Sequence, residues 1–153
     1  MAWGRDMKKQ IRVLIAHQDP VVSNRLRRIF HRQEDLVLMS PVKTKIEPVK
    51  AIGRRRPRVL LLDTRFVQAN SFGFLARLRQ CSPATQVLLL DKQYRSGQEV
   101  KAARMGARGY IGGPVEPATL RKAVQVIEAG EIWMRRKTMA RVLDEFLTLL
   151  SPA

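Results

Sequence analysis

Two short segments in which every residue is apolar constrain the fold of this chain most strongly. They read "VLLL" at 59–62 and "VLLL" at 87–90, and an aspartate follows each of them. A strand with apolar residues on both faces is buried on both faces, which is typical of the central strands of a parallel sheet. These segments therefore predict a sheet that is enclosed between two layers of helices.

Apolar runs and segments with helical spacing alternate along the rest of the chain. The predicted strands cover residues 11–16, 36–40, 58–63, 86–90 and 109–112. The predicted helices cover residues 22–30, 45–56, 71–80 and 95–105, and a fifth begins at Pro117 and ends before Gly130. This alternation predicts an α/β fold, a doubly wound parallel sheet of five strands with helices on both faces.

Polar residues and glycines stand where four of these strands end. They are His17, Gln18 and Asp19 after the first strand, Asp63 at the end of the third, Asp91 after the fourth, and Gly112 and Gly113 at the fifth. In doubly wound sheets the functional site lies beyond the carboxyl ends of the strands. We therefore expect these residues to converge.

Length and composition exclude several classes of protein. The 153 residues suffice for one domain with a core but not for two ordinary domains. A single cysteine, Cys81, excludes an intrachain disulfide and a multi-cysteine zinc site. No apolar run approaches the roughly 20 residues of a membrane helix, and no signal peptide is evident, so we expect a cytoplasmic protein without a membrane partner. A hydrolase or nucleotide enzyme finds no support, because there is no P-loop, G-x-G-x-x-G or serine elbow.

The net charge of +16, from 29 Lys and Arg against 13 Asp and Glu, is unusual. A field of this sign attracts polyanions, so one hypothesis is a basic nucleic-acid-binding module. The basic clusters are Arg25, Arg27 and Arg28; Arg54, Arg55, Arg56 and Arg58; and Arg135, Arg136 and Lys137. None of them is interleaved with the aromatic residues that stack on bases, and the alternative is a set of basic residues spread over solvated surfaces.

A further helix is predicted over residues 136–150, beyond the point where the five-stranded domain is complete. Its apolar residues form one stripe: Met139, Val142, Leu143, Phe146, Leu147 and Leu150. The stripe needs a partner, and three remain open: the flank of the same domain, a second copy of the chain in a homodimer, or a following domain.

Three segments resemble the CheY-like receiver domain of bacterial response regulators, specifically the LuxR/NarL-type subfamily, in which a receiver precedes a DNA-binding domain. "RVLIAHQDPVVSNRLRRIF" is similar to the first strand and helix, and "PRVLLLDTRFVQANSFGFLARLR" to the third strand and its loop. "AARMGARGYIGGPVEPATLRKAVQVIEAGEIWM" is the most specific match, around the last strand and helix. The resemblance implies a sheet with the strand order 2-1-3-4-5.

The resemblance, which covers residues 10–153, also implies a division of the chain. Residues 1–9 are an N-terminal tail, 10–131 the receiver domain, and 132–150 a linker with the extra helix. The chain ends in "LSPA", which resembles the opening of the DNA-binding domain of that subfamily. Residues 151–153 are thus expected to be the start of a DNA-binding domain that is missing from the chain.

A working receiver, as the resemblance implies, accepts a phosphoryl group from a histidine kinase on an aspartate, which is Asp63 here. Mg²⁺ is held by that aspartate, by a carboxylate after the first strand and by a backbone carbonyl, which is that of Arg65 here. A hydroxyl and a lysine then hold the transferred group. Tyr110 occupies the position of the aromatic switch residue.

This sequence departs from that pattern around Asp63. His17 and Gln18 replace the acidic pair, Asp91 replaces the hydroxyl, and Gly113 replaces the lysine. We therefore expect no cofactor, or Mg²⁺ held only weakly by Asp19, Asp63 and the Arg65 carbonyl, because imidazole and amide groups are poor Mg²⁺ ligands.

The charges at these positions predict weak phosphorylation. At about 5 Å and an effective dielectric constant near 20, each pair of unit charges contributes roughly 3 kcal/mol. Asp91 would repel a phosphoryl group by that order, and Gly113 removes an attraction of that order. Lys92 or Arg65 could compensate, but nothing in the sequence places their side chains.

Three hypotheses for Asp63 remain open at this point. It could share a proton with Asp91, because close carboxylates raise one pKa. It could bind a transition metal together with His17 and Asp91. It could also be a solvated relic at the end of a strand.

The sequence thus favours an atypical receiver domain of a two-component transcription regulator, which is not an enzyme. It would control an attached LuxR-type DNA-binding domain through dimerisation or interdomain contacts. These contacts would involve the helix at 136–150 and the face formed by the helix at 95–105, the last strand and the helix that begins at Pro117. The alternatives are a conventional receiver, phosphorylated at Asp63 by a histidine kinase, and the basic nucleic-acid-binding module.

Overall fold

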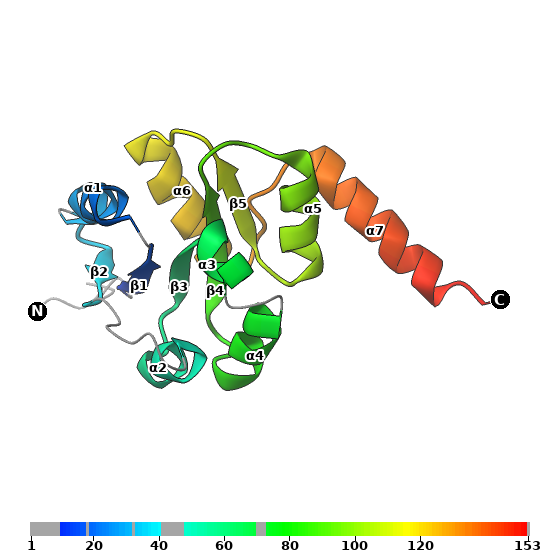
Figure 1. Ribbon diagram of the computed structural model, residues 1–153, viewed down its shortest axis with the longest axis horizontal. Coiled ribbons are helices and arrows are strands. Elements are labelled where there is room, and N and C mark those ends of the chain that lie inside the picture. The colour runs from blue at the N-terminus through cyan, green and yellow to red at the C-terminus, as the bar shows by residue number, and fades with distance from the viewer. Residues whose placement is uncertain (1–9, 18, 32, 41–47, 70–72, 153) are drawn as a thin grey trace, which may run out of the picture.

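The computed structural model describes residues 10–17, 19–31, 33–40, 48–69 and 73–152. Its strands are β1 (Ile11–Ala16), β2 (Leu36–Leu38), β3 (Val59–Asp63), β4 (Gln86–Asp91) and β5 (Gly109–Gly112). Its helices are α1 (Pro20–Phe30), α2 (Pro48–Arg55), α3 (Thr64–Ala69), α4 (Gly73–Cys81), α5 (Ser96–Arg104), α6 (Pro117–Glu128) and α7 (Arg136–Leu150). Figure 1 shows the sheet between helices on both of its sides.

All neighbouring strands run parallel, in the order β2-β1-β3-β4-β5. The predicted fold class and strand order are therefore confirmed. β3 lies at the centre of the sheet, paired with β1 and β4, and all of its residues are buried. Because the strands are parallel, the residues that follow them gather at one edge of the sheet.

Two apolar cores hold the sheet between its layers of helices. On one face, Leu60 and Leu62 pack with residues of α2, α4 and α5. On the other face, Val59 and Leu61 pack with residues of α1 and α6. Alternate residues of β3 thus enter different cores, which is why the whole run has to be apolar.

The observed helices differ from the predicted ones mainly after β3. Residues 64–69 form the short helix α3, where the sequence analysis expects only a loop, because six residues are too few for a helical period to stand out. The helix predicted over residues 45–56 is described from Pro48 onward, as α2. Residues 45–47 and 71–72 of the predicted helices lie outside the described residues.

The C-terminal helix α7 occupies the predicted range 136–150 and packs on α5. Near its start Thr138 is buried, and Met139 and Val142 are half-buried. Four residues of its apolar stripe are more than half exposed: Leu143, Phe146, Leu147 and Leu150. In Figure 1 the last turns of α7 extend away from the rest of the molecule. Packing on its own domain therefore covers only the first part of the helix.

Within the described ranges, no helix has both the length and the apolar character of a membrane span.

Candidate functional site

A cavity of about 740 Å³ lies at the carboxyl ends of the strands. The predicted site residues that line it are His17, Asp19, Asp63, Asp91 and Gly113. Their predicted convergence is confirmed, while Gln18 lies outside the described residues. The same cavity has basic residues at its edge, so cations and carboxylates share one site.

Asp63 is 3% exposed, and both of its carboxylate oxygens have partners. Its Oδ1 accepts a hydrogen bond from the backbone N–H of Arg65 at 3.0 Å. Its Oδ2 lies 3.2 Å from Nη2 of Arg65 and 3.3 Å from Nε2 of His17. A buried carboxylate at the end of β3 is thus held by a guanidinium and an imidazole. It is not a solvated relic, so that hypothesis is wrong.

The orientation of His17 follows from its second nitrogen. The backbone N–H of Asp19 donates to Nδ1 of His17 at 3.1 Å. A nitrogen that accepts a hydrogen bond carries no proton, so in the neutral ring the proton lies on Nε2. His17 therefore presents an N–H donor to Asp63.

Asp19 has a structural role at the start of α1. Its Oδ1 accepts a hydrogen bond from the backbone N–H of Val21 at 2.9 Å, which makes Asp19 the N-cap residue of the helix. Pro20 follows at the first helical position, where its lack of an N–H costs no hydrogen bond. The carboxylate of Asp19 thus stabilises α1 at the rim of the cavity.

Asp91 is buried and binds three side chains. Nη2 and Nε of Arg95 lie 3.0 and 3.1 Å from its two oxygens, a bidentate pair. The hydroxyl of Tyr110 donates to Oδ2 at 2.6 Å, and that of Thr64 donates to Oδ1 at 3.2 Å. Burial raises the pKa of Asp91, but the hydrogen bonds from Arg95 and Tyr110 outweigh burial, and the pKa is lowered overall. Both oxygens of Asp91 are bonded to Arg95, Tyr110 and Thr64 and not to Asp63, so the hypothesis that the two aspartates share a proton is wrong.

Tyr110, at the aromatic switch position, is 3% exposed. Besides donating to Asp91, its hydroxyl accepts a hydrogen bond from the backbone N–H of Arg95 at 3.2 Å. Burial and the hydrogen bond to Asp91 raise the pKa of Tyr110, so the phenol is protonated at neutral pH. Its ring is thus tied to the loop between β4 and α5.

Gly113 leaves the end of β5 without a cation. Its φ of 85° lies in the left-handed region that favours glycine, and no atom lies within 4 Å of the place of an added Cβ. Its backbone N–H donates to the carbonyl of Asp91 at 3.0 Å. The positive charge beside the two aspartates comes from Arg65 and Arg95.

A comparison with protein families identifies the chain: the model of the response regulator receiver domain matches residues 13–125. The chain belongs to this family. The match runs from β1 to β5 and through most of α6, and so includes the strand ends that line the cavity.

The relatives of this receiver domain include longer regulatory proteins. The transcriptional regulatory protein YhcZ of Bacillus subtilis is 26% identical over 133 residues, which are 87% of this chain and 62% of that protein. The oxygen regulatory protein NreC of Staphylococcus epidermidis is 27% identical over 145 residues, 90% of this chain and 63% of that protein. The chain thus spans less than two thirds of the length of these proteins.

Solved structures match the fold. A two-component response regulator of the LuxR family from Aurantimonas sp. SI85-9A1 has a TM-score of 0.73 at 21% identity, over 90% of this chain and 99% of that one. The isolated REC domain of RcsB from Salmonella enterica serovar Typhimurium has a TM-score of 0.72 at 15% identity, over 88% and 99%.

The described side chains around Asp63 differ from the Mg²⁺ ligands that the family resemblance implies. An imidazole stands at the end of β1, Asp19 caps α1, and Oδ2 of Asp63 lies between His17 and Arg65. The described chain also has no group of three or more His, Cys, Asp and Glu side chains that could hold a metal. The transition-metal site of His17, Asp63 and Asp91 is therefore wrong. The set of Asp19, Asp63 and the Arg65 carbonyl remains a prediction.

Arg95 and Thr64 are site residues that the sequence did not predict, and the position of the Arg65 side chain could not be predicted either. Arg95 stands four residues after Asp91, a spacing that predicts an ion pair within a helix but not across a loop. For Arg65 the sequence predicts a role of the backbone carbonyl, but it does not place the side chain. The ion pairs Arg65–Asp63 and Arg95–Asp91 depend on the conformations of the two arginine side chains, and a sequence pattern does not determine those conformations.

Proposed function

We propose that this receiver domain controls an attached LuxR-type DNA-binding domain and that it does so without being phosphorylated. Two Bacillus subtilis relatives are transcriptional regulatory proteins, and this chain spans 62% and 63% of their lengths. In the proposed division, 10–131 form the receiver, 132–150 the linker and 151–153 the start of the DNA-binding domain. A cytoplasmic location and the absence of enzymatic activity belong to the same proposal.

The observation that carries the proposal is the set of partners of Asp63. Its oxygens accept hydrogen bonds from the backbone and side chain of Arg65, and Oδ2 lies 3.3 Å from Nε2 of His17. These groups hold the carboxylate where a conventional receiver binds Mg²⁺. Phosphoryl transfer to Asp63 would have to displace them and would proceed without the metal that neutralises charge.

Asp91 would repel a phosphoryl group less strongly than the sequence alone implied. Arg95 forms a bidentate pair with Asp91, so much of the repulsion that Asp91 would exert on a phosphoryl group is neutralised. Asp91 still cannot donate a hydrogen bond as the family's hydroxyl does, because its oxygens are acceptors. The support for the proposal therefore rests mainly on the weakened metal site.

Intact-mass spectrometry tests the proposal. The folded chain is incubated with Mg²⁺ and acetyl phosphate, with the Asp63→Asn variant as the control. We expect no phosphoryl adduct on either protein. An adduct on the wild type alone would overturn the proposal and favour the conventional alternative, a receiver that a histidine kinase phosphorylates at Asp63.

We further propose that output runs through a homodimer that includes α7. The surface proposed for this contact comprises Met139, Val142, Leu143, Phe146 and Leu147. Leu143, Phe146 and Leu147 are 52–56% exposed on a helix that extends from the domain. Exposed apolar stripes of this kind are typical of protein interaction sites.

A basic nucleic-acid-binding module is the second candidate function, and one observation favours it. The helices α2 and α4, which contact each other, together contain Lys50, Arg54, Arg55, Arg77 and Arg79, and neither contains an acidic residue. A surface of this kind would bind the phosphates of a nucleic acid regardless of base sequence.

Salt dependence of binding to an unrelated DNA duplex tests this candidate. In a plot of the logarithm of the binding constant against the logarithm of the salt concentration, each phosphate contact adds about −0.9 to the slope. If α2 and α4 bind DNA, the variant Arg54→Gln, Arg77→Gln, Arg79→Gln has a shallower slope. A control with the same change in charge, Arg121→Gln, Lys122→Gln, Arg136→Gln, keeps the wild-type slope. The absence of salt-dependent binding, or equal slopes in both variants, would reject the candidate.

A further inference from the structure

Glu99 in α5 is a buried carboxylate that does not line the cavity around Asp63. It is 1% exposed, and it accepts hydrogen bonds from the hydroxyl of Tyr94 at 3.0 Å and from the hydroxyl of Thr138. The backbone N–H of Arg135 donates to its other oxygen at 3.3 Å. A buried carboxylate is costly without such donors. Two of the three donors belong to the start of α7, so Glu99 joins α7 to α5.

The start of α7 has a second attachment at the same place. Arg135, the N-cap residue of α7, makes no side-chain capping bond, and its guanidinium carbon lies 3.6 Å from the centre of the Tyr94 ring. A carboxylate at the N-terminus of a helix is also favourable, because the helix dipole is positive there. Tyr94, Glu99, Arg135 and Thr138 thus form one unit, the Glu99 cluster.

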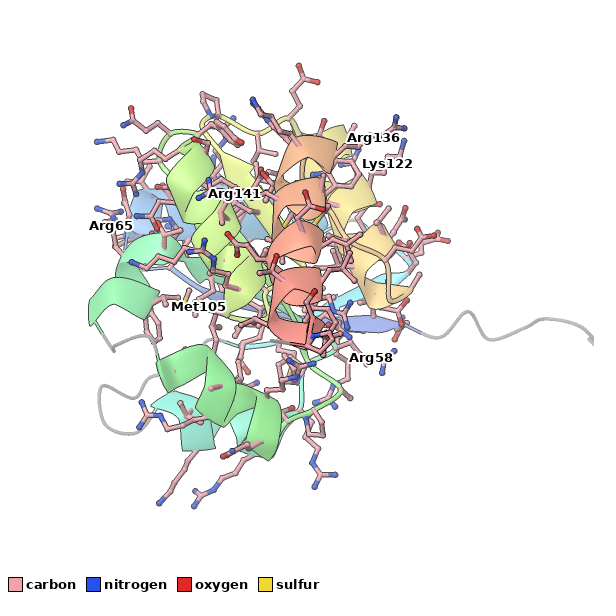
Figure 2. All side chains as sticks on the ribbon, turned by 90° about the vertical axis from the view of Figure 1, so that its right-hand side faces the viewer. Arg58, Arg65, Met105, Lys122, Arg136 and Arg141 are labelled. Carbon is pink, nitrogen blue, oxygen red and sulfur yellow. The ribbon has the colours of Figure 1, made fainter. Side chains whose placement is uncertain are left out.

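The Glu99 cluster is in contact with Tyr110, which bonds to Asp91 in the cavity. The rings of Tyr94 and Tyr110 meet edge to face, with centroids 5.9 Å apart, and the Tyr110 hydroxyl bonds to Asp91. The backbone of Tyr94 packs directly on β5: a Cβ added at Gly112 would lie 2.2 Å from the Tyr94 Cα. An unbroken series of contacts therefore runs from Asp91 to α7. Figure 2 shows α7 crossing the front of the molecule, while Arg65 is labelled at the edge.

We propose that Glu99 is a positioning residue that fixes the start of α7 and, through Tyr94 and Tyr110, makes the placement of α7 depend on the Asp91 end of the cavity. This inference about Glu99 rests on the proposed function in one respect, namely that α7 connects the receiver domain to an output domain. Glu99 would then link the state of the site to the position of the linker.

Hydrogen exchange of the amides of residues 139–142 tests the proposal, because these amides form the first backbone hydrogen bonds of α7. The variants are Glu99→Gln and Asp91→Asn. The control is Glu145→Gln, the same change at an exposed acid that pairs α7 with Arg104 of α5. In Glu99→Gln and Asp91→Asn we expect the exchange rates of amides 139–142 to rise about fivefold or more. Fivefold is about the smallest effect that coupled sites usually have on each other. The control should leave these amides unchanged.

Coupling between two sites is reciprocal, so the cavity should respond as well. We expect Glu99→Gln, but not Glu145→Gln, to shift the amide resonances of Arg95 and Gly113, whose N–H groups bond to Tyr110 and Asp91. If Glu99→Gln speeds exchange but Asp91→Asn does not, Glu99 is only a local anchor and the proposed dependence on the cavity is overturned. If neither variant changes exchange, Glu99 does not position α7.

Tyr94→Phe keeps the test decisive if Glu99→Gln fails to fold. It preserves the ring that contacts Tyr110 and Arg135 and removes only the hydroxyl that bonds to Glu99, so a smaller rise in exchange is expected. Unchanged exchange in Tyr94→Phe and Asp91→Asn would overturn the proposal. The exchange experiments use no phosphoryl donor, so their outcome does not depend on whether Asp63 is phosphorylated. An adduct on Asp63 in the mass-spectrometry test would refute the proposed function and would leave this coupling in place.

Discussion

Asp91 is surrounded by donors, although the sequence suggested a repulsive charge. Arg95, Tyr110 and Thr64 hydrogen-bond to it, and each of these side chains comes from a different segment. A buried carboxylate is stable when several donors replace the lost water. The burial of Asp91 is thus matched by the guanidinium of Arg95, which neutralises its charge.

Asp91 should make stability depend on pH in a particular direction. Its pKa in the folded protein is below the usual value of 3.8, so its stabilising contribution is present above pH 3.8 and is lost as pH falls through the lower folded pKa. Urea unfolding of the wild type and Asp91→Asn, between about pH 7 and about pH 2.5, measures this. We expect the wild type to be more stable at neutral pH, with the difference shrinking below about pH 4. A constant difference over the whole range would contradict the ion pair.

Two glycines provide a matched test of the packing between the β4–α5 loop and β5. Gly112→Ala would push a methyl group into the backbone of Tyr94, and we expect a loss of roughly 1–3 kcal/mol in the free energy of unfolding. Gly97→Ala, in α5, meets nothing within 4 Å and should stabilise by about 0.5–1 kcal/mol. Denaturant unfolding of both variants checks the expected opposite signs, and a neutral Gly112→Ala would mean that the loop can move away.

At the scale of elements, the length of a segment decided how well the sequence predicted it. The range of α7 and the start of α6 at Pro117 agree with the predictions, because each helix has several turns of periodic apolar residues. The helix α3 was missed because it is short, and β2 is shorter than its predicted range. A sequence pattern also could not tell which part of the α7 stripe is covered, because contact with α5 ends partway along the helix.

The exposed part of α7 makes a prediction of its own. Leu143→Gln combined with Phe146→Gln should leave stability nearly unchanged, since both side chains are 56% exposed, but should abolish a dimer that forms through this face. Leu149→Gln is the control, because Leu149 is 83% exposed and lies off the stripe. Light scattering after size exclusion gives the molar mass of each variant. A wild-type monomer, or a dimer that survives the double change, would contradict the proposed interface.

At the scale of the whole molecule, the alternation of strands and helices was enough to predict where the site lies. Parallel strands bring His17, Asp63 and Asp91 to one edge whatever their side chains do. The partners of those side chains could not be predicted, since Arg65 and Arg95 reach the aspartates along long, flexible chains. The topology therefore gives the place of the chemistry, and the side-chain conformations give its character.

The net charge of +16 makes two proposed associations respond to salt in opposite directions. Two copies of the chain repel each other, so a dimer formed by apolar residues of α7 should become tighter as salt screens the charge. Binding to DNA should become weaker, because salt competes for the phosphates. Sedimentation equilibrium and fluorescence anisotropy over the same salt series measure both, and a dimer that weakens with salt would contradict an apolar interface.

The most direct test of phosphorylation-independent control compares the wild type with a variant whose acidic pair is restored, His17→Asp with Gln18→Asp. Both are treated with Mg²⁺ and acetyl phosphate and weighed by intact-mass spectrometry. We predict a phosphoryl adduct on the restored variant, lost when Asp63→Asn is added, and none on the wild type. An adduct of equal yield on the wild type, also lost with Asp63→Asn, would contradict the account and make this an ordinary phosphorylated receiver.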